Sequence, residues 1–204
     1  SQHYGNRLFL NSGQGAFRDA TAEPLDRNEW AFDATVGDID NDGDMDVLHT
    51  NHDDPVLLLS NLGSGQFEDI TEAAGLGGIN PTYSVWFLDI DNDGDLDLLK
   101  GFGFGILLND GDGRFNVATD TGMPAGYAGG GIVADLNDDG WIDLYTLGGQ
   151  DGGRVFLGQD NGNHWLRVEL VGVHSAPNGI GARVLARTGD LRQVRQILGG
   201  TGYD

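Results

Sequence analysis

Three stretches of the sequence place an acidic residue at nearly every second position around one glycine. They read DIDNDGDMD from Asp38, DIDNDGDLD from Asp89 and DLNDDGWID from Asp135. Carboxylates this close repel one another when ionised, so a bound cation would stabilise them. Several oxygen ligands in a flexible loop suit Ca²⁺, whereas Zn²⁺ favours nitrogen and sulfur and Mg²⁺ keeps more of its waters. The three loops are therefore predicted to bind calcium.

Each loop supplies its ligands by position in the nine-residue motif. Positions one, three, five and nine offer side-chain oxygens, and position seven offers its backbone carbonyl. Trp141 supports this assignment, because at position seven of the third loop only its main-chain oxygen could coordinate. The glycine at position six permits a sharp turn. The predicted metal-binding residues, for about three calcium ions, are Asp38, Asp40, Asp42, Asp44, Asp46, Asp89, Asp91, Asp93, Asp95, Asp97, Asp135, Asn137, Asp139, Trp141 and Asp143.

An EF-hand shares the pattern D-x-D-x-D-G but does not fit this chain. Its loop requires a bidentate glutamate at position twelve and a helix on each side. Position twelve is His49, Lys100 or Thr146 here, and no helical periodicity flanks the loops. The remaining alternative is an acidic surface turn that binds no ion. It has more weight for the third loop, where Asn137 replaces an aspartate.

The loops belong to a repeat of about 50 residues. A second motif keeps the same period: RLFLNSGQGAFRDAT from Arg7, LLLSNLGSGQFEDIT from Leu57, ILLNDGDGRFNVAT from Ile106, and a degenerate RVFLGQDNGNHW from Arg154. Short apolar runs such as SVWFLDI precede the acidic loops, runs such as LDLLKG follow them, and Gly-rich turns come next, a pattern that predicts short strands. Four such strands per unit predict an all-β fold of β-propeller-type blades, with antiparallel strands and a β-rich C-terminal segment.

The acidic loop and the N-x-G-x-G-x-F turn together resemble the FG-GAP/VCBS repeat family over roughly residues 1–160. The resemblance implies calcium loops between the strands of propeller blades. NHWL, NGIGARV and QVRQILGGTGY further along resemble the ASPIC/UnbV segment of cartilage acidic protein-like chains. The expected domains are repeats at 1–162 and an incomplete ASPIC/UnbV-like segment at 163–204. Within the repeats we expect a partial blade at 1–27 and blades at about 28–76, 77–124 and 125–162.

Composition narrows the class of partner. Acidic residues outnumber basic ones 32 to 11, for a formal charge of −21. This balance disfavours nucleic acid and anionic membranes, which bind basic surfaces. Cysteine is absent, which excludes a disulfide framework and thiolate metal sites. No apolar run approaches the roughly 20 residues that span a bilayer. We expect no membrane insertion and an extracellular or cell-surface location, where calcium can stabilise a fold that lacks disulfides.

Other residue groups have simpler interpretations. The cluster HTNHDD, from His49 to Asp54, could hold a transition metal, but a solvated loop fits it better. No nucleophile elbow, P-loop, HExxH motif or Cys–His pair is present. Four aromatic residues are expected in blade cores, although rings at the end of a propeller can also stack on sugars: Trp30, Phe32, Trp86 and Phe87.

Three classes of function follow from these patterns. The leading prediction is an extracellular calcium-binding scaffold or adhesion module with a structural calcium role and a protein or carbohydrate partner. The first alternative is a self-assembling structural (filament) subunit, because three blades and a partial one leave apolar faces that another copy could cover. The second is a carbohydrate-active enzyme, because some fungal sugar-lyase chains resemble the same repeat-plus-ASPIC arrangement.

Overall fold

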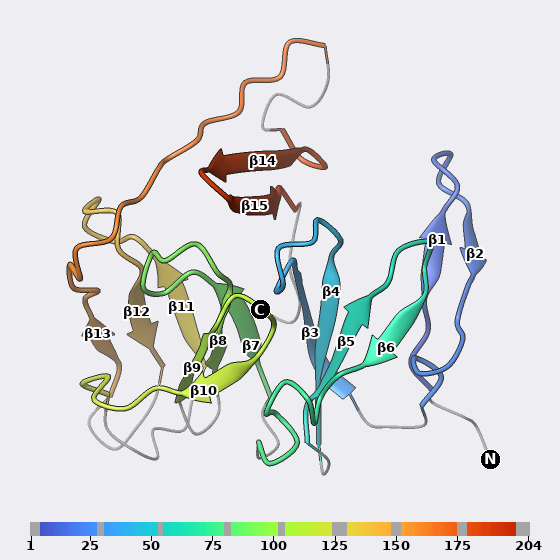
Figure 1. The fold of residues 1–204 in the computed structure, drawn as a ribbon, viewed down its shortest axis with the longest axis horizontal. Coiled ribbons are helices and arrows are strands. Elements are labelled where there is room, and N and C mark those ends of the chain that lie inside the picture. The colour runs from blue at the N-terminus through green and yellow to red at the C-terminus, as the bar shows by residue number, and fades with distance from the viewer. Residues whose placement is uncertain are drawn as a thin grey trace.

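The computed structural model describes residues 5–27, 31–52, 55–79, 83–101, 105–123, 130–147, 152–174 and 179–198. Over these ranges the chain forms β-strands and no α-helix (Figure 1). The strands are β1 (Phe9–Asn11), β2 (Phe17–Asp19), β3 (Ala31–Gly37), β4 (Asp46–Asn51), β5 (Leu57–Asn61), β6 (Phe67–Asp69), β7 (Val85–Leu88), β8 (Asp97–Lys100), β9 (Gly105–Asn109), β10 (Phe115–Val117), β11 (Gly131–Ala134), β12 (Asp143–Thr146), β13 (Arg154–Phe156), β14 (Arg183–Thr188) and β15 (Leu191–Gln196).

Within each sheet, strands that are neighbours in sequence pair antiparallel. The sheet orders are β1–β2, β3–β4–β5–β6, β7–β8–β9–β10, β11–β12–β13 and β14–β15. Both four-stranded sheets are meanders, as expected of propeller blades, and Figure 1 shows the blades following one another across the view. The predicted all-β fold of short antiparallel strands is confirmed. β1 and β2 carry the same Gly-rich turn as β5–β6 and β9–β10, so they match the outer half of a blade.

The third sheet, β7–β10, is buried on both faces. Side chains of adjacent strand residues point to opposite faces, and in β8 the fully buried Leu98 packs into one core while Leu99 packs into another. The first core joins this sheet to β3–β6 through Leu48 and Leu58, and the second joins it to the β11–β13 sheet through Leu144. The inter-blade packing of a propeller therefore follows from two successive leucines.

The aromatic residues only partly follow expectation. Phe87 packs against the first core and Trp86 against the second. Phe32 is instead 44% exposed and contacts the rings of His52 and Tyr83. Trp30 lies outside the described residues, as do Asp53 and Asp54 of the histidine cluster and residues 199–204. No helix in the described ranges is long and apolar enough to cross a membrane.

All three acidic loops lie at the same place in their blades. They connect β3 to β4, β7 to β8 and β11 to β12, the first and second strands of each sheet. The Gly-rich turns that connect the third and fourth strands lie at this same end, next to the acidic loops. The β14–β15 hairpin lies over this end of the molecule (Figure 1).

Candidate metal centres in the acidic loops

The three loops share one backbone conformation despite their sequence differences. Positions four and six have positive φ in every loop: 59° and 102° in the first, 56° and 106° in the second, 60° and 90° in the third. Asparagine and aspartate tolerate this left-handed region better than most residues, and glycine adopts it freely. They occupy these positions as Asn41, Gly43, Asn92, Gly94, Asp138 and Gly140. The third loop therefore folds like the others even with Asn137 and Trp141 in place of aspartates.

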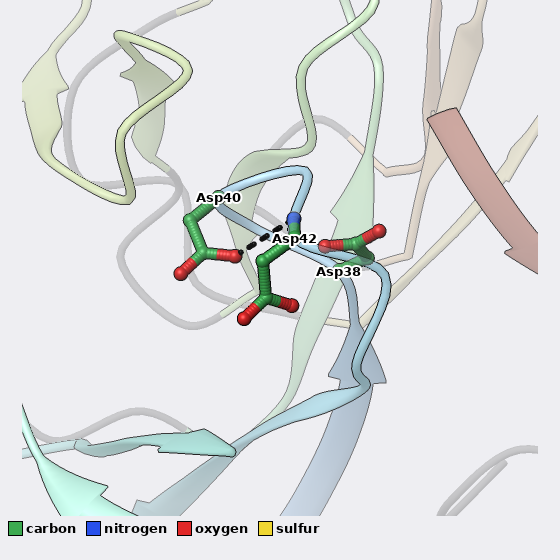
Figure 2. Close-up of side chains that lie close together, drawn as sticks. All are labelled: Asp38, Asp40 and Asp42. Carbon is green, nitrogen blue, oxygen red and sulfur yellow. Dashed lines mark hydrogen bonds between the residues drawn. The ribbon is translucent and has the colours of Figure 1, made fainter. Parts of the chain in front are cut away.

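Hydrogen bonds between residues close in sequence turn the aspartate side chains of each loop back toward the loop backbone. Asp40 Oδ1 accepts a bond from the Asp42 backbone N–H at 3.2 Å, and Asp42 Oδ1 accepts one from Asp44 at 2.7 Å. Asp38 Oδ2 accepts the Gly43 N–H at 3.1 Å. Figure 2 shows the carboxylates of Asp38, Asp40 and Asp42 lying close together. These Asx-type turns are the local chemistry that aspartates favour.

The position-nine aspartates have a structural role that the sequence analysis missed. Asp46, Asp97 and Asp143 are at most 1% exposed, and each accepts two backbone N–H bonds of 2.8–3.0 Å. One donor is position two of the same loop. The other donor is the residue that opens the Gly-rich turn. Asp46 thus ties Ile39 to Asn61. The matching period of the two motifs was the available signal, since it puts both residues of the pair in every unit, 12 or 15 positions apart.

The structure brings some of the predicted ligands together and leaves others apart. Carboxylate oxygens of Asp38, Asp40 and Asp42 lie within 4.8 Å of one another, and so do oxygens of three aspartates in the second loop: Asp89, Asp91 and Asp97. Among the described acidic and histidine residues, the third loop provides no comparable group of three. There the Asn137 amide donates to Asp139 Oδ2 at 2.8 Å.

The position-seven side chains turn away from these groups. Asp95 Oδ1 accepts a bond from the Asn41 amide at 2.6 Å, and its carboxylate lies against Gly111, where an added Cβ would be 2.6 Å from Oδ2. Trp141 likewise packs against Gly158 and is 6% exposed. Coordination by the position-seven carbonyl stays a prediction, but the side chains at this position contact the following Gly-rich turn.

Burial controls the protonation of the loops. It raises the pKa of Asp46 and of Asp97 to about 7 and that of Asp89 to about 6, against hydrogen bonds from backbone N–H groups that favour ionisation. Burial also raises the pKa of Asp38 and Asp91. Such shifts mark carboxylates at which desolvation outweighs the groups that favour ionisation, which at Asp89 include the Arg195 guanidinium.

Two carboxylate oxygens show where a cation fits. Oδ1 of Asp38 and Oδ1 of Asp89, both at position one, are buried without a hydrogen-bond partner in the described part of the chain. Leaving a buried polar atom unsatisfied is costly. Each belongs to a group of converging carboxylates with hard oxygen ligands only. The residues of the first two loops therefore fit a calcium ion on geometry as well as on sequence.

The loops are also bonded to one another and to the C-terminal residues. The position-four amide of Asn41 reaches Asp95 in the next loop, and that of Asn92 reaches the Gly140 carbonyl at 3.2 Å. At the third loop, Arg167 lies 3.4 Å from Asp135 Oδ2 and 3.0 Å from Asp138 Oδ1. The acidic end of the blades is thus one connected hydrogen-bonded network.

The histidines of the HTNHDD cluster do not form a metal group in the described chain. His49 is 6% exposed, and its Nε2 lies 3.3 Å from the Asn6 amide nitrogen. His52 contacts the ring of Phe32 at a centroid distance of 5.3 Å. The two rings therefore contact different neighbours. The predicted solvated loop is wrong for His49, Thr50 and Asn51, because these residues lie buried in β4.

Blades of this topology, with an acidic loop after the first strand, are the arrangement expected of FG-GAP-like repeats. Residues 1–49 and 48–99 match the FG-GAP-like repeat family. The chain is 28% identical to human cartilage acidic protein 1 over 97% of its own length and 33% of that protein. The mouse protein of the same name is also 28% identical, over 34% of its length. Mouse integrin alpha-7 is 32% identical over 35% of this chain and 7% of the integrin.

These matches confirm the resemblance on which the sequence analysis relied. The chain spans about a third of the length of the cartilage acidic proteins that it matches. The assignment of residues 163–204 to an ASPIC/UnbV-like segment, and the blade boundaries, stay predictions.

Proposed function

We propose that this chain is an extracellular interaction scaffold of β-propeller blades in which calcium has a structural role. The relatives, one named for cartilage and the other for an integrin, place it outside the cell or at the cell surface. Its acidic surface favours cations and disfavours nucleic acid. The blades supply the surface for a protein or carbohydrate partner, and the loops fix the geometry of the blade ends.

One observation carries the calcium proposal: the buried, unpartnered Oδ1 of Asp38 and of Asp89 inside groups of facing carboxylates. Bound calcium would neutralise the facing carboxylates, which Arg195 does only in part at the second loop. Asp38, Asp40 and Asp42 would hold the first ion with the Asp44 carbonyl and Asp46. The position-nine carboxylate can do this while keeping its backbone bonds, because each oxygen has a second lone pair.

The second and third loops would use the equivalent residues. Asp89, Asp91, Asp93 and Asp97 would hold the second ion with the Asp95 carbonyl. In the third loop the ligands would be Asp135, Asn137, Asp139 and Asp143, with the Trp141 carbonyl. Because Asn137 carries no charge, the third site should be the weakest, since calcium affinity depends on the number of charged ligands.

Self-assembly is a second candidate with its own observation. Large apolar side chains are exposed on the first and last blade sheets, among them Phe9 (54%), Phe17 (63%) and Val155 (54%). Blades normally bury such faces against a neighbouring blade or a cap. Another copy of the chain is therefore a second proposed partner. We propose no catalytic role, since no side-chain constellation among the described residues suggests one.

The calcium proposal is tested by titrating the metal-free chain with Ca²⁺ in a calorimeter and by following its melting temperature. Binding to the folded state stabilises it by about 2.7 kcal/mol per site at a hundredfold excess over Kd. Dissociation constants of about 10⁻⁴ to 10⁻³ M are expected, as in extracellular modules. Magnesium should stabilise less at equal concentration. An unchanged melt after complete metal removal, with no heat of calcium binding, would rule the proposal out.

A further inference from the structure

The C-terminal hairpin β14–β15 lies over the acidic end of the blades (Figure 1) and contacts the first two acidic loops. Leu185 pairs with Val194 and Val184 with Arg195, so alternate pairs face opposite sides of the hairpin. One side, with Arg183, Leu185, Arg192 and Val194, lines a cleft of about 240 Å³ together with residues 41–43 of the first loop. The other side faces the second loop.

Contacts with the second loop are close. A Cβ added at Gly94 would overlap the side chains of Leu191 and Gln193. Arg195 Nη2 donates to the Gly94 carbonyl at 3.3 Å, and the same nitrogen lies 3.8 Å from Asp89 Oδ2. On the opposite side, Arg183 donates to the carbonyl of Gly43. The hairpin therefore contacts each loop through one arginine. In both loops that arginine donates to the backbone carbonyl of the glycine at position six.

Arg195 differs from Arg183 in its proximity to a predicted calcium ligand. Asp89 is the position-one carboxylate of the group formed with Asp91 and Asp97. The Arg195 side chain is 35% exposed, so water screens its charge only in part. A guanidinium and a divalent cation that share one carboxylate repel each other, and each weakens the binding of the other.

We propose that Arg195 is a resident counter-cation of the second loop, and that hairpin docking and calcium binding at this loop oppose each other. This inference rests on the calcium-binding function proposed above. In the metal-free chain Arg195 neutralises part of the negative charge of the second loop and keeps the hairpin docked against it. Because coupling between two binding events is reciprocal, calcium at the second loop weakens hairpin docking by the same factor by which the docked hairpin weakens calcium.

Calcium titration of the full 204-residue chain tests the coupling. Arg195→Gln should tighten one site roughly five- to tenfold, within the usual range of coupling between sites. Arg187→Gln is the matched control, because Arg187 lies on the same hairpin and its guanidinium donates to the nearby Gly189 carbonyl at 3.2 Å instead of to an acidic loop. Its calcium affinities should equal those of the unmodified chain. Because the charge of Arg195 acts most on Asp89 and less on Asp38, the effect of Arg195→Gln should persist in an Asp42→Ala background and be much smaller in an Asp93→Ala background.

A conservative variant separates charge from packing. Arg195→Lys keeps the positive charge and should stay near the original affinity. If Arg195→Lys and Arg195→Gln tighten the site equally, loss of packing explains the result and the counter-cation inference is wrong. Unchanged or weaker binding in Arg195→Gln, with normal calcium binding by the unmodified chain, overturns this inference alone. Absence of calcium binding by the unmodified chain overturns the proposed function as well.

Hydrogen exchange of residues 191–196 gives a readout that does not depend on affinity. An undocked two-stranded hairpin is only marginally stable, so calcium should speed exchange of these amides in the unmodified chain. In Arg195→Gln exchange should already be fast without calcium. Calcium-induced protection of the hairpin in the unmodified chain would show that docking and calcium binding support each other, which contradicts the inference.

Discussion

Two neighbouring aspartates of the first loop allow a charge-matched test of calcium coordination. Asp42, at position five, belongs to the converging carboxylate group. Asp44, at position seven, is predicted to coordinate only through its backbone carbonyl, and its carboxylate lies near Gly63. Asp42→Ala and Asp44→Ala remove the same charge from the same loop. We expect only Asp42→Ala to abolish the first calcium site.

The size of the effect follows from linkage. A lost site forfeits about 2.7 kcal/mol of calcium-dependent stability at a hundredfold excess over Kd. For a chain of this length, each kcal/mol corresponds to about 2–4 °C in melting temperature. The calcium-induced rise in melting temperature should therefore be about 5–10 °C smaller in Asp42→Ala than in the unmodified chain. Without metal, the stability of Asp42→Ala should change little, because the variant loses a carboxylate that repels Asp38 and Asp40 but also loses the acceptor of the Asp44 N–H.

The assay is a pair of thermal melts, in chelator and in saturating calcium, with the number of bound ions counted by native mass spectrometry. The unmodified chain and Asp44→Ala should bind the same number of ions, and Asp42→Ala one fewer. Equal loss in both variants would refute the assignment of position seven to the backbone. Full occupancy in both would refute the assignment of Asp42 as a ligand.

Three other predictions follow from the site and the blade faces. Burial raises the pKa of Asp46 and Asp97 far above the unfolded value of about 4, so the metal-free folded state binds more protons than the unfolded state. The unfolding free energy without metal should therefore rise as the pH falls from 8 to 5. Calcium affinity should fall over the same range. A metal-free unfolding free energy that does not change with pH would contradict this. Asp46→Asn should lower the free energy of unfolding by about 1–3 kcal/mol even without calcium, because an amide has one oxygen and cannot accept both backbone bonds. Denaturant unfolding in chelator would measure this loss. The exposed Phe9 and Val155 faces should make residues 1–204 associate in sedimentation experiments, and a compact monomer at high concentration would contradict self-assembly.

The repeat architecture could be predicted because its signals are local. Alternating aspartates, Gly-rich turns and apolar runs of strand length recur with one period, and each determines the backbone near itself. The positive φ of Asn41 and Gly43 follows from the same local preferences. This is why the third loop keeps the shared conformation although two of its ligand positions carry other residues.

The structural features that the sequence analysis did not predict depend on contacts between different segments of the chain. The period of the repeat puts Asp46 and Asn61 in the same unit, but it does not indicate that the Asp46 carboxylate joins Ile39 to Asn61. Nor does it indicate that the Asn109 amide donates to the Ile39 carbonyl at 2.7 Å. The hairpin β14–β15 contacts two loops that are far from it in sequence. Arg195, for example, bonds to Gly94, about a hundred positions away. The exposure of Phe32 similarly depends on how its blade packs, and hydrophobicity alone predicted it wrongly.

Position four of the loops has a consequence for how such an array can grow. Asn41 and Asn92 each donate forward to the next loop, and the second uses a main-chain carbonyl, an acceptor that any residue offers. A duplicated blade could therefore be joined to its successor without a matching side chain. In the third loop this position is Asp138, which accepts a bond from Arg167 and has no amide to donate. Within the described residues, the links from one loop to the next through position-four amides therefore end at Asp138, where Arg167 bonds to the third loop instead.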